Sequence, residues 1–123
     1  MKLDHLQLAM PPGEEDRARN FFIGVLEMTE EAKPYPLSKR GGCWFRRDAV
    51  ILHLGIEADF QPQRKAHPAF VMPHLKSLAQ KLSDQNLPVT WDTALPNRTR
   101  FYSTDPFGNR IEFIQAGDGF SEK

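Results

Sequence analysis

The sequence has only one cysteine, Cys43, among its 123 residues and no surplus of either charge. A single cysteine excludes an intramolecular disulfide and a cysteine-rich zinc site, and we expect its thiol to be buried and inert. Lys and Arg number 16, as do Asp and Glu. The chain therefore lacks the basic excess that favours binding to nucleic acid or to an anionic membrane. No apolar run approaches the ~18 residues of a membrane span, and the opening MKLDH lacks the apolar core of a signal peptide. We expect a cytoplasmic protein with neither nucleic acid nor membrane as a partner.

One short segment occurs twice, about half a chain apart. HLQLAMP at residues 5–11 returns as HPAFVMP at residues 67–73. Both copies begin with histidine, a potential metal ligand, and both end in Met-Pro. A unit that occurs twice and opens each time on such a residue predicts a duplicated domain with a metal between its halves.

Both halves show the same order of secondary-structure patterns. Alternating apolar residues predict strands and apolar residues at helical spacing predict helices, so that each half runs strand, helix, then three strands. The predicted helices are 14–26 and 75–82, and the predicted strands include 3–10, 43–46, 50–55, 89–91, 100–103 and 110–115. A DPFG turn at 105–108 precedes the last strand.

These elements predict an α+β fold of two tandem βαβββ modules, which form a curved mixed sheet around a metal or ligand cavity. We expect one domain spanning residues 1–123. Module 1 covers about 1–57, a polar linker about 58–65 and module 2 about 66–117, followed by a frayed polar tail.

The alternation of the predicted strands separates polar from apolar side chains. The apolar face of each sheet is expected to pack on the helices, which leaves the other face to six polar residues: His5, Gln7, His53, His67, Arg110 and Glu112. An ionised glutamate buried there alone would be costly, and a divalent cation would neutralise it.

Three imidazoles and one carboxylate are ligands that suit Zn, Ni, Mn, Co or Fe. The subset His5, His67 and Glu112 also satisfies the arrangement of two histidines and one carboxylate that binds non-haem iron. Any single histidine is more often structural than a ligand, but the matched positions favour a metal site made by the whole set.

The far ends of the two halves also correspond, since WFRRD at residues 44–48 aligns with FYSTD at residues 101–105. Gln7 and Arg110 share a face with the candidate ligands. Arg110 either meets an anionic substrate or forms an ion pair near the site.

The run YSTDPFGNRIE at residues 102–112, together with the opening DHLQL, resembles the vicinal oxygen chelate superfamily. That superfamily includes glyoxalase I, fosfomycin-modifying transferases, ring-cleaving dioxygenases and bleomycin-resistance binding proteins. The resemblance covers nearly the whole chain and implies paired βαβββ modules with metal ligands on the first and last strands of each module. The matching positions are His5, His53, His67 and Glu112. Tyr102 resembles a position that contacts substrate in the fosfomycin-modifying enzymes, and Trp44 is its counterpart in the first half, so both are candidate substrate-binding residues, with plain packing of the strands as the alternative. Glyoxalase I usually has Glu where this chain has His53.

The resemblance implies a metal-dependent lyase, isomerase or thiol transferase of the glyoxalase type, acting on a small substrate with vicinal oxygens. Its divalent metal would stabilise an enolate or oxyanion, and Glu112 would either only ligate that metal or also move a proton. An extradiol-type Fe(II) dioxygenase and a non-catalytic drug- or metabolite-binding protein are the alternatives. Small members of the superfamily are commonly dimers, which implies a homodimer with sites inside one chain or shared between two.

Overall fold

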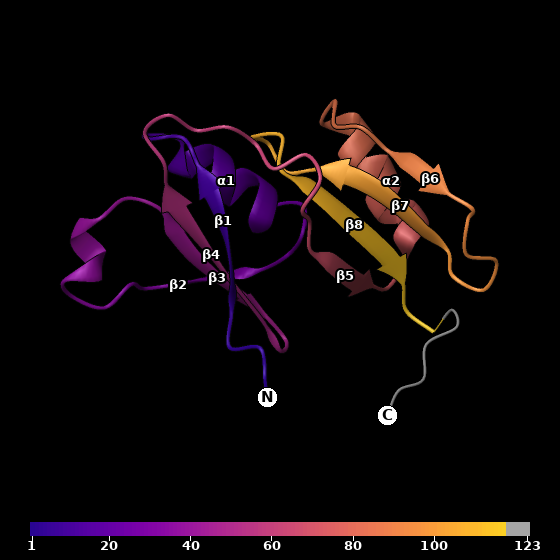
Figure 1. Ribbon diagram of the computed structural model, residues 1–123, viewed down its shortest axis with the longest axis horizontal. Helices are drawn as coiled ribbons and strands as arrows, with labels where there is room; N and C mark the ends of the chain where they lie inside the picture. Colours follow the sequence, from indigo (N-terminus) through magenta and orange to yellow (C-terminus); the bar gives the residue numbers. More distant parts are fainter. Residues whose placement is uncertain (118–123) are drawn as a thin grey trace. The chain divides into compact units, whose positions relative to one another are not determined.

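The chain forms two compact units, Met1–Pro62 and Gln63–Lys123. The computed structural model describes residues 1–117, shown as a ribbon in Figure 1. The boundary between the units falls inside the linker expected at 58–65. The tail expected after residue 117 lies outside the described residues. No helix within residues 1–117 has the length and apolar character needed to cross a membrane.

The first unit contains strand β1 (Leu6–Met10), helix α1 (Glu15–Phe22), strand β2 (Thr29–Glu31), a short 3-10 helix (Leu37–Lys39), strand β3 (Cys43–Arg47) and strand β4 (Val50–Ile56). Its four strands form one mixed sheet in the order β1-β4-β3-β2. The pair β1–β4 is parallel, and the other two pairs are antiparallel.

The second unit repeats this arrangement with β5 (Ala69–Met72), α2 (Leu75–Asp84), β6 (Thr90–Asp92), β7 (Arg100–Thr104) and β8 (Arg110–Gln115). Its sheet has the order β5-β8-β7-β6, with β5 and β8 parallel. The predicted α+β fold of two βαβββ modules is therefore confirmed, and each module has its own four-stranded mixed sheet.

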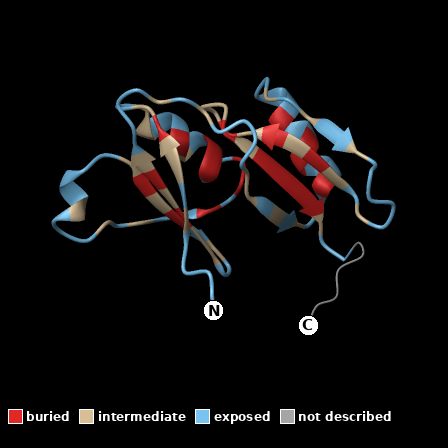
Figure 2. Cartoon of the chain, viewed as in Figure 1, coloured by how far each residue is buried: buried red, intermediate tan, exposed pale blue. Residues whose placement is uncertain are grey.

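Helices and sheets join through the apolar faces that the sequence predicts, and Figure 2 shows the buried residues along the central strands and on both helices. In the first unit Phe22 of α1 stacks on Phe45 of β3 with ring centroids 5.3 Å apart. The single cysteine, Cys43, is buried in the same sheet, and burial raises the pKa of its thiol to about 11. The expected burial of this thiol is thus confirmed, and its raised pKa favours the protonated, less nucleophilic form at neutral pH.

Two details of the first unit differ from the sequence prediction. Helix α1 ends at Phe22, although Val25 and Leu26 remain buried as the apolar pattern required. The chain turns at Gly24, where a β-carbon would lie 2.3 Å from the Asn20 carbonyl oxygen. Strand β2 (Thr29–Glu31) was not located from the sequence because its three polar residues carry no apolar alternation.

The strand register shows which residues of the two modules correspond. His53 of β4 is paired with Gln7 and Trp44, whereas Glu112 of β8 is paired with Ala69 and Tyr102. His53 and Glu112 are therefore equivalent, and so are Trp44 and Tyr102. The predicted alignment of 44–48 with 101–105 is wrong by one residue. Residues 48–49 connect β3 to β4, whereas the longer segment 105–109 connects β7 to β8.

The turn from β7 to β8 is built around Asp105, whose side chain is completely buried. Its Oδ1 accepts hydrogen bonds from the backbone N–H groups of Phe107 (2.9 Å) and Asn109 (3.0 Å), and its Oδ2 accepts from Asn109 Nδ2 at 2.8 Å. Gly108 adopts φ 94°, a conformation that favours glycine. The predicted DPFG turn is confirmed, and its stability rests on one carboxylate.

We predict that Asp105→Ala lowers the free energy of unfolding by about 2–4 kcal/mol, because it leaves buried donors without acceptors. The urea midpoint of the full chain measures this change. Asp59→Ala is the matched control, since Asp59 is exposed and its loss should cost less than about 0.5 kcal/mol. Equal effects of the two substitutions would contradict the role given to Asp105.

Candidate metal and substrate site

In the first unit, three of the predicted site residues form a stack on the open face of the sheet. His53 lies between Trp44, at a centroid distance of 4.0 Å and an interplanar angle of 2°, and His5, at 4.2 Å and 24°. Burial, followed by the proximity of His5, lowers the pKa of His53. His53 is therefore an uncharged imidazole at neutral pH.

The histidine before β1 has a defined orientation. Nδ1 of His5 lies 2.8 Å from Asp4 Oδ2, and because a carboxylate only accepts, Nδ1 carries the proton and Nε2 has the free lone pair. Imidazole lone pairs lie in the ring plane, so the stacked rings of His5 and His53 hold theirs in nearly parallel, separate planes. One ion can be reached by both nitrogens only if one of the rings turns.

These residues line a hollow of about 720 Å³ in the first unit, a size that suits a small-molecule ligand. Gln7 lies on its surface beside Gly55, where a β-carbon would be 2.6 Å from Gln7 Nε2. The loop after β2 forms part of the wall, and Lys33 Nζ holds it by donating to the carbonyl oxygens of Arg40 (3.0 Å) and Gly41 (2.7 Å). Three predicted residues, Gln7, Trp44 and His53, thus line one hollow with His5.

In the second unit the other two predicted ligands touch. Nε2 of His67 lies 3.1 Å from Glu112 Oε1, and Nδ1 of His67 lies 2.9 Å from the Lys65 carbonyl oxygen. Since a carbonyl oxygen only accepts, Nδ1 carries a proton, and a neutral His67 would direct its Nε2 lone pair at Glu112. That contact is repulsive unless a cation lies between the two atoms, either a second proton on His67 or a metal ion.

The spacing of the two atoms fits a shared ion. Two ligands at right angles around one ion, each with a bond of about 2.1 Å, lie about 3.0 Å apart. The carbonyl of Lys65 orients His67 in the way that hydrogen-bonded neighbours orient metal-binding histidines. The spacing of His67 and Glu112 is compatible with two adjacent metal ligands, and their role as ligands stays a prediction.

A third residue, Arg100, controls this carboxylate, and the sequence analysis did not identify it. Its Nη1 donates to Glu112 Oε2 at 2.9 Å and to the Tyr102 hydroxyl at 3.0 Å, and its Nη2 lies 3.1 Å from Asp92 Oδ2. Arg100 and Tyr102 are two residues apart on β7 and therefore share the face that carries Glu112. The alternation used to place the ligands could therefore have revealed this arginine.

Arg100 also decides the charge of Glu112, whose side chain is only 10% exposed. Burial by itself would raise the pKa of Glu112, but the hydrogen bonds from Arg100 and His67 outweigh it and lower the pKa below 4.5. The carboxylate is therefore ionised at neutral pH and available as a ligand.

The predicted four-ligand set lies as two pairs, His5 with His53 and His67 with Glu112. Within residues 1–117, no group of three or more His, Cys, Asp or Glu side chains comes together in a geometry that holds a metal ion. A shared ion on all four residues stays a prediction. Arg110 lies over the Tyr102 ring, 4.0 Å from its centroid, beside the second pair.

Proteins similar to this chain are found among solved structures. No protein-family model matches the chain, and no curated protein does. Among solved structures, a putative glyoxalase family protein from Bacillus anthracis is 44% identical, with a TM-score of 0.86 over 94% of each chain. A glyoxalase/dioxygenase from Nostoc punctiforme has a TM-score of 0.75 at 20% identity, over 93% of this chain and 90% of its own. The fosfomycin resistance protein FosX from Listeria monocytogenes has a TM-score of 0.76 at 11% identity, over 94% and 93%.

The paired βαβββ modules and the two distant matches define a protein of the glyoxalase fold. The 44% identity across almost the whole length is more specific. The chain belongs to the glyoxalase family, and with it to the vicinal oxygen chelate superfamily.

We predict that Arg100→Met raises the pKa of Glu112 above 4.5 in the metal-free protein, because burial then acts without its main compensation. Because the pKa of Glu112 is lower in the folded state, its ionised form stabilises the fold above pH 4.5, and this stabilisation is lost as the pH falls through the lowered pKa. In the variant, the raised pKa should make ionisation of Glu112 destabilising, so its contribution to folding should decrease as the pH rises. Carbon-detected NMR titration of glutamate carboxyl groups measures the shift.

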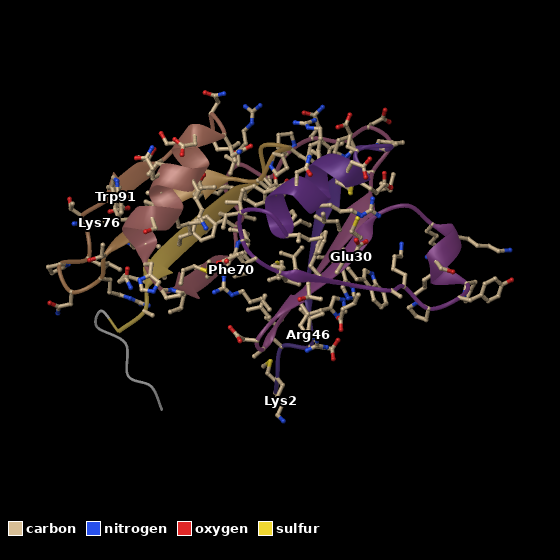
Figure 3. All side chains as sticks on the ribbon, turned by 180° about the vertical axis from the view of Figure 1, so that it is seen from behind. Lys2, Glu30, Arg46, Phe70, Lys76 and Trp91 are labelled. Carbon is tan, nitrogen blue, oxygen red and sulfur yellow. The ribbon has the colours of Figure 1, made fainter. Side chains whose placement is uncertain are left out.

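Arg46→Met supplies the matched control for this titration. Arg46, which is labelled on β3 in Figure 3, pairs with Glu31 in the first unit, where both side chains are more than a third exposed. We expect Arg46→Met to leave the titration of Glu112 almost unchanged, since solvent screens the Arg46–Glu31 pair. A Glu112 that still titrates below 4.5 in Arg100→Met would refute the assigned role of Arg100.

Proposed function

We propose that this protein is a metal-dependent enzyme of the glyoxalase type that acts on a small substrate with vicinal oxygens. The observation that carries the proposal is the spacing of 3.1 Å between His67 Nε2 and Glu112 Oε1, which suits two ligands of one divalent ion. His5, His67 and Glu112 would hold a divalent ion, with His53 as a fourth candidate. When bound, that ion would act as a Lewis acid toward the substrate oxygens.

The charges around the second pair favour a cation. Asp92, Arg100 and Glu112 form one connected cluster of two carboxylates and one guanidinium, which leaves one negative charge in excess. Their side chains are 29%, 12% and 10% exposed, so solvent screens that charge only in part. A cation next to His67 would balance it.

The chain's own side chains have separate tasks in this proposal. His67 is oriented by Lys65, and Glu112 is kept ionised by Arg100, so both are ready before a ligand arrives. Glu112 either ligates only or also accepts a proton from the substrate. Tyr102 is fixed by the hydrogen bond from Arg100 and presents its ring to the substrate, and Gln7 and Trp44 line the hollow of the first unit.

The family relationship supports the reaction class without selecting a substrate. The similar structures carry the names glyoxalase, glyoxalase/dioxygenase and fosfomycin resistance protein.

The proposed enzyme is a homodimer. Light scattering of the metal-loaded protein measures its molar mass and therefore tests this state.

We predict that the full-length protein binds one divalent ion per chain, and that His67→Ala and Glu112→Gln each weaken this binding by more than about 100-fold, because each removes a ligand. Elemental analysis after loading with Ni, Zn, Co, Mn or Fe(II) measures occupancy. His74→Asn is the control, since His74 is exposed and has φ 52°, which asparagine tolerates.

The same variants separate an enzyme from a binding protein. The metal-loaded protein is assayed with a methylglyoxal hemithioacetal, with fosfomycin and a thiol, and with catechols under oxygen after anaerobic Fe(II) loading. Turnover that disappears in His67→Ala supports the proposal, and oxygen uptake with catechols assigns the dioxygenase class. A protein that takes up no metal, or whose ligand affinity survives His67→Ala without turnover, would overturn the proposal.

A further inference from the structure

A second hollow lies in the second unit, next to the His67–Glu112 pair. It has a volume of about 290 Å³, and no Asp or Glu within residues 1–117 lines it. Two positive residues and three residues with hydroxyl groups contribute to its wall, namely Arg64, Arg110, Thr90, Tyr102 and Thr104. A concentration of guanidinium and hydroxyl donors without a carboxylate is the chemistry of an oxyanion site.

Neither arginine is neutralised by an acidic side chain in the part of the chain that the structure describes. Within residues 1–117, Arg64 and Arg110 form no ion pair, whereas Arg17, Arg19 and Arg100 each have an acidic partner. Arg110 lies over the Tyr102 ring at 4.0 Å from the ring centroid. The ring supports the flat face of the guanidinium and leaves its N–H edges available to a ligand.

The turn after β7 fixes the two arginines beside each other. Asn109, itself held by Asp105, accepts a hydrogen bond at its Oδ1 from the Gln63 backbone N–H at 3.0 Å. The backbone N–H of Arg110 donates to the Gln63 carbonyl at 2.8 Å. These two bonds tie the segment that contains Arg64 to the start of β8, so the hollow is held in place by a buried network.

We propose that this hollow binds the anionic group of the substrate, a phosphate, phosphonate or carboxylate, with Arg64 and Arg110 as its cationic contacts. As a statement about the substrate, this inference rests on the function proposed above. Arg110 and Glu112 are two residues apart on β8 and share a face, so their α-carbons lie roughly 7 Å apart. The substrate would then be a small anion whose charged group meets Arg110 while its vicinal oxygens face Glu112 and His67.

The test is a set of titrations of the whole, metal-free protein, in which NMR and calorimetry measure binding. The probes are inorganic phosphate, methylphosphonate and acetate. We expect saturable binding of at least one probe, weakened about tenfold by Arg110→Gln and by Arg64→Gln, because each removes a charge-assisted contact. Binding of acetate alone assigns a carboxylate, and binding of the two phosphorus oxyanions assigns a phosphoryl or phosphonyl group.

Two controls make the result specific. Arg17→Gln removes an exposed arginine of α1 that does not line the hollow, and it should change the affinity by less than about twofold. Arg110→Lys, which keeps the charge, should restore part of the loss. Absence of saturable binding by all three probes, or equal weakening by Arg17→Gln, would overturn the proposal.

Failure of the subsite and failure of the proposed function give different results. Glu112→Gln should remove metal binding and leave anion binding by the metal-free protein in place. Anion binding that depends on Arg110 in a protein that takes up no metal refutes the metal-dependent enzyme and keeps an anion-binding hollow. Metal uptake with flat titrations by all three probes refutes the anion subsite and keeps the enzyme.

Discussion

The ion pair of Arg100 and Glu112 is the interaction on which the candidate site depends. A carboxylate that is only 10% exposed would favour its neutral form, and a neutral Glu112 would be a poor metal ligand. The hydrogen bond from Arg100 at 2.9 Å reverses that preference. The same guanidinium fixes the Tyr102 hydroxyl and reaches Asp92 on β6, so one side chain connects three strands of the sheet.

The two modules share a topology but differ at this arginine. Because Trp44 is equivalent to Tyr102, the position equivalent to Arg100 is Gly42. At Gly42 the backbone has φ 96°, and a β-carbon would lie 2.1 Å from the Leu54 carbonyl oxygen, so no side chain fits there. Module 1 therefore cannot place an arginine beside its last strand, and its equivalent of Glu112 is His53, which stays neutral in a stack. At this equivalent position one module therefore carries an ionised carboxylate and the other an uncharged imidazole.

The sequence was informative where a local pattern determines the result. Strand alternation placed His5, Gln7 and His53 on one face, and the Asp-Pro-Phe-Gly run predicted the turn. It was less informative where partners come from distant segments. The contacts of Arg100 with Asp92 and Glu112 depend on the pairing of β6, β7 and β8, and no local sequence pattern gives that pairing. The one-residue error between the modules arose because similar residue types were aligned, whereas the hydrogen-bonded register is set by the length of the turn.

Strand β8 brings two opposite electrostatic environments close together on a rigid element. The cluster around Glu112 has one negative charge in excess, and the hollow around Arg110 has two arginines without an ion pair within residues 1–117. The α-carbons of Arg110 and Glu112 are separated by two residues of extended backbone, which does not stretch as a loop does. A ligand that satisfies both environments must carry a negative group at one end and cation-binding oxygens at the other.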